Sequence, residues 1–259
     1  MRILKLEALT EDTLLNGKVI IQQPKDGFRA TSDSVFLASA INAGTNDRIL
    51  DLGCGSGSAS LCLANRVGDT KIVGLEIDRD LARLAQDNAV LNGFERRFES
   101  IVGDLVKPLP RIAPHSFDHI MANPPYYEIG KTTPPRQSKR LRAHSDSQVN
   151  LSSWVSFAFR MAKHGGTITF IQRTERLTDM LKYLSARSGQ ITVFPLWSHD
   201  PFIDRSKGAK RVIIQAKMGS DAELKLHGGL ILHNPDGTFT KEAEKILRKG
   251  DALDLLGSK

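Results

Sequence analysis

Residues 48–67 read RILDLGCGSGSASLCLANRV, and the architecture of the chain can be worked out from them. Residues 48–53 form an apolar run typical of a buried strand, and residues 58–67 have the apolar spacing of a helix. Three alternate glycines between them let the backbone turn sharply and approach a ligand without a Cβ clash. A glycine loop that joins a strand to a helix is typical of nucleotide-binding α/β proteins.

Strands and helices alternate along the rest of the chain as well. Further strands are predicted at 71–78, 99–104, 117–123, 167–172, 191–197 and 210–217. Further helices are predicted at 79–93, 151–166 and 174–189. The last two strands follow one another with no helix between them, so they should form an antiparallel pair. We therefore expect an α/β fold with helices on both faces of a seven-stranded, mostly parallel sheet whose last strand is antiparallel.

The composition of the chain fits one globular unit. The 259 residues are 40% hydrophobic, and no apolar run reaches the length of a membrane span. The first residues lack the features of a secretory signal, and the two cysteines are too few for a disulfide framework. We expect a single cytoplasmic domain (1–259) without a membrane partner. Its parts are an N-terminal segment (1–45), the core sheet (46–217) and a C-terminal hairpin with a short helix (218–259).

Acidic residues end three successive strands at the edge where ligands bind in open α/β sheets. These residues are Asp51, Glu76 and Asp104. The glycine loop lacks the Lys-Ser/Thr pair of a phosphate-binding loop and the spacing of a dinucleotide fingerprint. Acids here suit a ligand with a cationic amino group, ribose hydroxyls and an adenine amino group, and S-adenosylmethionine has all three. The alternative is that each acid merely caps a helix or a turn.

In these features the chain resembles the class I S-adenosylmethionine-dependent methyltransferases over roughly residues 20–217. The resemblance implies the Rossmann-like fold of that class, with S-adenosylmethionine as the cofactor. Such a fold would hold the cofactor through the glycine loop, the acids and the residues beside them, with the amide at the end of the fourth strand close by. The implied cofactor-binding residues are Asp51, Gly53, Gly55, Gly57, Glu76, Ile77, Asp104, Leu105 and Asn123.

Residues 123–126, Asn-Pro-Pro-Tyr, end the strand predicted at 117–123. The prolines fix the turn and contribute no N–H, so the turn presents two acceptors, the Asn123 side-chain oxygen and the Pro124 carbonyl. This pair can hold both hydrogens of a planar exocyclic amino group and aim the nitrogen lone pair at a methyl donor, while Tyr126 stacks on the base. A plain strand-ending turn is the alternative. The predicted catalytic residues are Asn123, Pro124, Pro125 and Tyr126.

Basic residues cluster directly after this motif. Residues 129–145 carry five lysines and arginines and no acid, and the whole chain has a formal net charge of +7. Such a loop suits a phosphate backbone, so RNA is the expected partner, and the alternative is a solvated loop without a role in binding. The predicted substrate-binding residues are Tyr126, Lys131, Lys139, Arg140, Arg142, Lys210 and Arg211.

Four segments together resemble the bacterial tRNA1(Val) (adenine(37)-N6)-methyltransferase family. They are QPKDGFRATSDSVFLASA (23–40), NPPYY (123–127), RVIIQAKMGS (211–220) and HNPDGTFTKEAEKIL (233–247). The resemblance implies methylation of the 6-amino group of adenine in RNA, with tRNA as the partner. It also implies that Phe28, Arg29 and Asp33 lie near the methionine end of the cofactor. The chain departs from the family in RLRAHSDS (140–147), where the first acid comes two residues after the histidine.

Two other functions fit the same residues. A protein glutamine or rRNA guanine methyltransferase can use the same motif on the same scaffold. A non-catalytic RNA-binding protein can retain the cofactor fold, although the intact motif and the three acids speak against it. The histidines show no metal-ligand spacing, so no metal is expected, and no oligomeric state is predicted.

Overall fold

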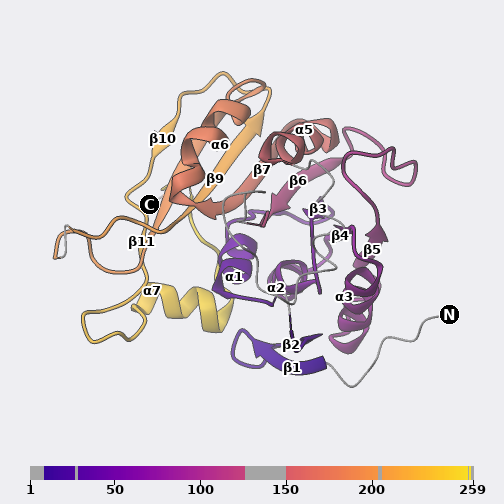
Figure 1. Cartoon of the computed structure of the whole chain (residues 1–259), viewed down its shortest axis with the longest axis horizontal. Helices are drawn as coiled ribbons and strands as arrows, with labels where there is room; N and C mark the ends of the chain where they lie inside the picture. The colour runs from indigo at the N-terminus through magenta and orange to yellow at the C-terminus, as the bar shows by residue number, and fades with distance from the viewer. Residues whose placement is uncertain (1–8, 27–28, 126–149, 204–205, 256, 258–259) are drawn as a thin grey trace.

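The computed structural model describes residues 9–26, 29–125, 150–203, 206–255 and 257. A twisted sheet runs through its centre, with helices on both sides (Figure 1). The strands are β1 (Leu9–Leu14), β2 (Val19–Pro24), β3 (Arg48–Leu52), β4 (Lys71–Glu76), β5 (Phe98–Val102), β6 (Phe117–Ala122), β7 (Ala162–Arg173), β8 (Ser188–Trp197), β9 (Arg211–Met218), β10 (Lys225–Leu226) and β11 (Leu230–Ile231). The helices are α1 (Ser32–Ser39), α2 (Ser58–Arg66), α3 (Arg79–Leu91), α5 (Leu151–Met161), α6 (Leu177–Leu184) and α7 (Lys241–Glu244), with a 3-10 turn at Thr174–Arg176 and a π turn at Lys245–Lys249.

The central sheet confirms the predicted fold. Its long strands lie in the order β8-β9-β7-β6-β3-β4-β5. Neighbouring strands are parallel except at β9, which runs antiparallel to both β7 and β8. Two further strands of two residues each, β10 and β11, pair with β8 and extend the sheet to nine strands. Their pairing with β8 was not predicted: β10 is too short to show the alternation that marks a strand, and β11 was expected only as part of the C-terminal hairpin.

Two apolar clusters hold the layers together, one on each face of the sheet. Helices α1, α2 and α3 lie on one face (Figure 1). They bury side chains such as Phe36, Leu61 and Ala89 there. On the other face, α5 and α6 bury Phe157 and Leu184. Both faces are covered, which is why the central strands read as nearly continuous apolar runs. Within the described ranges, no helix has the length and apolar composition needed to cross a membrane.

The helix predicted at 151–166 ends earlier, at Met161, and β7 follows directly. The two glycines that suggested the end of the helix lie inside this strand instead. Gly165 has φ +77°, and a Cβ on Gly166 would lie 2.8 Å from the Asp118 carbonyl oxygen. The pairing of β7 with β6 shifts register in the same region. The glycines therefore allow an irregularity where two backbones approach closely, which a sequence pattern does not distinguish from a helix end.

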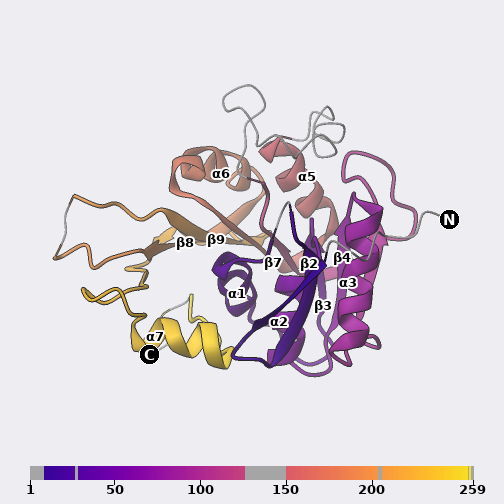
Figure 2. The same cartoon turned by 60° about the horizontal axis from the view of Figure 1, so that its bottom comes forward.

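A hairpin of β1 and β2 packs beside α3 (Figure 2). β1 was not predicted, because four of its six residues are polar. The free edge of β2 is covered by Asn88 of α3 and by Asn92, the residue directly after this helix. Asn92 Oδ1 accepts the Ile20 N–H at 2.8 Å, and Asn88 Oδ1 accepts the Gln22 N–H at 2.9 Å. These bonds take the place of a neighbouring strand and anchor the hairpin beside the glycine loop.

The C-terminal segment forms the turn and short helix that the sequence indicates. The Gly237 N–H donates to the Asn234 carbonyl at 2.9 Å, and His233 and Phe239 form an isolated β-bridge across the turn. The helix α7 then continues into the π turn. Ile246 of this turn is buried in the same cluster as α1, so the C-terminal segment closes one side of the core.

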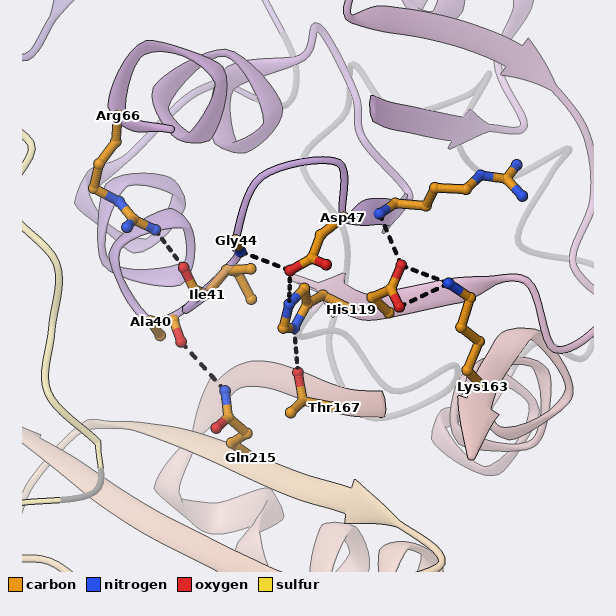
Figure 3. A network of polar contacts seen from close by, with 11 residues as sticks. Ala40, Ile41, Gly44, Asp47, Arg66, His119, Lys163, Thr167 and Gln215 are labelled. Atoms are coloured by element: carbon orange, nitrogen blue, oxygen red, sulfur yellow. Dashed lines mark hydrogen bonds and ion pairs between the residues drawn. The ribbon is translucent and has the colours of Figure 1, made fainter. Parts of the chain in front are cut away.

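A polar network fastens the amino-terminal edge of the sheet (Figure 3). His119 of β6 lies between the Asp47 carboxylate (Nε2 to Oδ2, 3.1 Å) and the Thr167 hydroxyl (Nδ1 to Oγ1, 2.8 Å). Beside it, Lys163 Nζ pairs with the Asp118 carboxylate at 2.7 Å. These contacts join the segment before β3 to β6 and β7, at the edge opposite to the carboxyl ends of the strands. We interpret the network as a structural one.

Candidate functional site

The parallel strands β3, β4, β5 and β6 bring their carboxyl ends to one edge of the sheet. Asp51 lies one residue before the end of β3, Glu76 is the last residue of β4, and Asp104 comes two residues after β5. Asn123 follows β6 directly. Parallel pairing of neighbouring strands is what gathers these four residues, which are up to about 70 positions apart in the sequence, along a single edge.

The glycine loop takes the backbone conformations that its sequence requires. Gly53, Gly55 and Gly57 have φ values of +68°, +57° and +92°, which residues with a side chain rarely adopt. A Cβ on Gly53 would lie 2.6 Å from the Trp154 ring, whereas a Cβ on Gly55 would meet nothing within 4 Å. Close packing therefore requires glycine at position 53. At position 55 the surface is open, so a ligand can approach the backbone there.

Asp51 is a buried carboxyl group at the centre of this edge. Its side chain accepts a hydrogen bond from the Ser60 hydroxyl of α2 at 2.7 Å. Burial raises the pKa of Asp51 to about 7, and the nearby charge of Glu76 adds to the rise while the Ser60 hydrogen bond opposes it. The group therefore titrates near neutral pH. An ammonium group placed beside it would stabilise the charged form.

Glu76 ties the glycine loop to the end of β4. Its Oε2 accepts the Gly55 N–H and its Oε1 accepts the Asp78 N–H, both at 2.9 Å. Burial raises the pKa of Glu76, and these backbone hydrogen bonds oppose the rise. Each oxygen of a carboxylate can accept more than one hydrogen bond, so Glu76 can hold the loop and still accept from a ligand.

Asp104 caps the turn that follows β5. Its Oδ1 accepts the Val106 N–H at 3.1 Å, and Lys107 Nζ lies 3.7 Å from its Oδ2. Asp104 therefore has a capping role. This role leaves its carboxylate able to accept a further hydrogen bond from a ligand. Ile77 and Leu105, each directly after one of the acids, are half-buried.

The described part of the proline motif continues from the end of β6. Asn123 is half-buried, Pro124 is buried and Pro125 is exposed. The Pro124 carbonyl accepts a hydrogen bond from Gln172 Nε2 at 3.2 Å. Several predicted site residues lie outside the described residues: Phe28, Tyr126, Lys131, Lys139, Arg140 and Arg142.

The start of α1 lies beside the glycine loop. It connects the predicted cofactor-binding residues with one of the predicted substrate-binding residues. The Ser58 hydroxyl at the start of α2 donates to the Ser34 hydroxyl at 3.0 Å, which brings the two helix starts together. Asp33, predicted to lie near the cofactor, pairs with Arg211, predicted to bind substrate (Oδ2 to Nε, 2.8 Å). Lys210, next to Arg211 in the chain, is exposed.

Arg29 is held by the N-terminal hairpin. Its guanidinium donates to the Asp12 carboxylate at 2.6 Å, to the Thr10 hydroxyl at 2.8 Å and to the Pro24 carbonyl at 3.0 Å. Gln23 also donates to Asp12, at 2.8 Å. Arg29 therefore fastens the segment before α1 to the hairpin, a contact that the sequence pattern did not indicate.

Three buried polar residues at this edge were not predicted from the sequence. Ser60 bonds Asp51, Gln172 bonds Pro124, and Asn88 Nδ2 donates to the Ser56 carbonyl of the glycine loop at 2.9 Å. Ser60 and Asn88 are polar residues on the buried faces of amphipathic helices, and that is a signal by which they could have been found. Gln172 is the next-to-last residue of β7, and its sequence position gave no such signal. Within the described ranges, no group of histidine, cysteine, aspartate or glutamate side chains could hold a metal ion.

Comparison with known proteins identifies the family. The family model of the methyltransferase small domain matches residues 29–149. The tRNA1(Val) (adenine(37)-N6)-methyltransferase of Actinobacillus succinogenes is 30% identical over 230 residues, which cover 88% of this chain and 92% of the relative. The enzyme of the same name from Shewanella halifaxensis is 35% identical over 168 residues, or 64% of this chain and 66% of the relative.

The solved structures agree on the fold. A predicted O-methyltransferase of Agrobacterium tumefaciens has a TM-score of 0.69 at 21% identity, covering 85% of this chain and 98% of that protein. At this identity the likeness concerns the fold alone, and it confirms the Rossmann-like methyltransferase fold. The similarity to the Actinobacillus succinogenes protein extends over nearly the whole of both chains. The chain is therefore an S-adenosylmethionine-dependent methyltransferase, and it belongs to the tRNA1(Val) (adenine(37)-N6)-methyltransferase family.

Proposed function

We propose that this methyltransferase transfers the methyl group of S-adenosylmethionine to N6 of adenine 37 in tRNA1(Val), in the cytoplasm. The observation that carries the proposal is the Asn-Pro-Pro-Tyr motif, which begins at the carboxyl end of β6 beside the glycine loop. The names of the relatives support the choice of tRNA and of nucleotide. The formal net charge of +7 supports a polyanionic substrate.

The residues at the carboxyl edge fit S-adenosylmethionine. The open backbone at Gly55 allows close approach, and the two buried carboxyl groups of Asp51 and Glu76 suit an ammonium group and ribose hydroxyls. Asp104 and the half-buried side chains of Ile77 and Leu105 complete the proposed adenine end of the site. We also propose that the N-terminal segment (1–45) covers the cofactor, and the contact between Ser34 and Ser58 supports this.

In the proposed reaction, the chain acts mainly by positioning. When bound, S-adenosylmethionine supplies a methyl group already activated by a sulfonium leaving group. Asn123 Oδ1 and the Pro124 carbonyl oxygen each accept a hydrogen bond from one N–H of the adenine amino group. This draws the nitrogen towards tetrahedral geometry and concentrates its lone pair on the side facing the methyl group. Tyr126 is proposed to stack on the base, which must leave its helical stack to reach the site.

The proposed RNA-binding residues lie after the motif and at the start of β9. Arg211 is already paired with Asp33, so an approaching phosphate would share the guanidinium group with the Asp33 carboxylate. Exposed Lys210 offers the more accessible charge. The basic residues of the loop after the motif are proposed to follow the phosphate backbone: Lys131, Lys139, Arg140 and Arg142.

The test measures modified nucleosides in tRNA. Mass spectrometry of digested tRNA from a deletion strain should show the loss of one N6-methyladenosine, and the wild-type gene should restore it. Purified protein should methylate a tRNA1(Val) transcript at A37, and a matched transcript with guanine at that position should accept no methyl group. Unchanged tRNA together with the loss of a methylglutamine from a peptide would make the acceptor a protein and refute the proposal.

A further inference from the structure

Gln172 is a buried amide in contact with the proline motif. It is the next-to-last residue of β7, the strand beside β6, and only 2% of its surface is exposed. Its Nε2 donates to the Pro124 carbonyl at 3.2 Å, between residues that are 48 positions apart in the sequence. A buried amide that loses its partner destabilises the protein, so the contact constrains the turn as well as the glutamine.

The orientation of this amide follows from the roles of its partners. The Arg173 backbone N–H can only donate, and it lies 3.2 Å from Gln172 Oε1. The Pro124 carbonyl can only accept, and it faces Nε2. Turning the amide over would place donor against donor and acceptor against acceptor, so both bonds would be lost. Gln172 is thus fixed at its oxygen by its own strand and extends an N–H to the turn.

The Pro124 carbonyl needs such a fixed contact. The ring of Pro124 restricts φ, and Pro125 confines the ψ of Pro124 to the extended range, within which the contact with Gln172 sets the direction of the carbonyl. The following residue, Pro125, has no N–H through which the turn could be closed by a backbone hydrogen bond. A carbonyl oxygen has two lone pairs, so accepting from Gln172 leaves one free to accept from a substrate.

We propose that Gln172 is a positioning residue for methyl transfer: it aims the Pro124 carbonyl at the acceptor amino group. This inference rests on the proposed function, in which that carbonyl holds one amino hydrogen. Gln172 acts through Pro124 and does not itself touch the substrate. Its loss should therefore slow the chemical step and leave cofactor binding intact, since displacing a reacting group by about 1 Å can cost about 100-fold in rate.

The test compares two glutamine-to-methionine variants. Methionine has nearly the volume of glutamine but no amide, so Gln172→Met keeps the core filled and removes the bond to Pro124. The matched control is Gln215→Met on β9. Gln215 Nε2 donates to the Ala40 carbonyl at 3.2 Å and to the Thr169 hydroxyl at 2.9 Å, and neither partner belongs to the motif. Figure 3 shows the contact of Gln215 with Ala40, near the polar network at the amino-terminal edge of the sheet.

Single-turnover and steady-state kinetics with tRNA1(Val) separate the outcomes. For Gln172→Met we expect kcat to fall by about 10- to 100-fold, with KM for the cofactor and Kd for S-adenosylhomocysteine within about three-fold of wild type. For Gln215→Met we expect kcat within about two-fold, at a similar loss of thermal stability. If Gln172→Met does not fold, Gln172→Asn replaces it, because the side chain is one methylene too short to bridge Arg173 and Pro124.

Equal kcat values for the Gln172 variant and wild type would overturn the inference while leaving the proposed function intact. Equal losses of kcat in the Gln172 and Gln215 variants would also overturn it, because the effect would then be one of general stability. A wild-type protein that methylates no tRNA would instead refute the proposed function, and with it the acceptor role of Pro124.

Discussion

Replacing Asp51 by asparagine tests whether a buried charge at this position destabilises the folded protein. Raising the pKa of a carboxyl from its ordinary value of 3.8 to about 7 disfavours the charged form in the folded protein. One pKa unit corresponds to about 1.4 kcal/mol, so the ionised group destabilises the folded protein by about 4 kcal/mol. Because Asp51 is only 2% exposed, solvent screening does little to reduce this figure.

The sign of the pH dependence follows from where the proton is bound. Between pH 3.8 and about 7 the folded protein keeps the Asp51 proton and the unfolded chain does not. Stability therefore falls as pH rises through this window and levels off above it. The Asp51→Asn side chain would carry no such charge, and its amide oxygen can still accept the Ser60 hydrogen bond. The constant cost of burying the amide cancels when two pH values are compared.

The assay is urea denaturation of wild type and Asp51→Asn, both without cofactor, at about pH 5 and about pH 8. We expect the wild-type unfolding free energy to drop by about 3 kcal/mol more than that of the variant between these two pH values. The raised pKa of Glu76 contributes to both proteins and largely cancels in the difference. Parallel pH dependences for the two proteins would show that Asp51 ionises in the folded protein without a loss of stability, which would contradict its raised pKa.

Three further predictions concern the motif, the loop and the glycine turn. Asn123→Ala should lower methyl transfer by at least about 100-fold and leave the Kd for S-adenosylhomocysteine, measured by calorimetry, within a few-fold. Loss of S-adenosylhomocysteine binding would show that Asn123 acts mainly on the cofactor and would contradict its role in holding the acceptor amino group. Neutralising three basic loop residues together should weaken tRNA binding and flatten its dependence on salt, and an unchanged slope would remove the loop from the RNA path. Gly53→Ala should lower the unfolding free energy, measured by chemical denaturation, by about 1–3 kcal/mol, because the new Cβ would lie 2.6 Å from the Trp154 ring. Adding Trp154→Ala to the same chain should recover part of this stability. If Gly53→Ala lowers stability equally with and without Trp154, the clash is not its cause. The three loop residues are Lys139, Arg140 and Arg142.

Much of the fold followed from local patterns in the sequence. Most strands and helices of the core were predicted within a few residues, because each is long enough to show its own periodicity. The helix predicted at 174–189 was too long, since it ends at Leu184 and residues 188 and 189 belong to β8. The misplaced boundary at 151–166 and the missed strand β1 have a common cause. A glycine pair can serve a bulge or a helix end, and a short polar run becomes a strand only when a partner pairs with it. Local sequence carries no information on which partner is present.

Local patterns in the sequence were sufficient to predict the type of fold and the chemical character of the site. A strand, a glycine loop, acids at successive strand ends and a proline turn each depend on a few neighbouring residues, so their order along the chain was sufficient. How those groups are held depends on contacts between residues that are distant in the sequence. Gln172 reaches Pro124 across 48 positions and Arg211 reaches Asp33 across 178, distances over which no local pattern operates. The pKa of Asp51 likewise depends on burial by surrounding helices and strands, and burial exists only once the chain has folded.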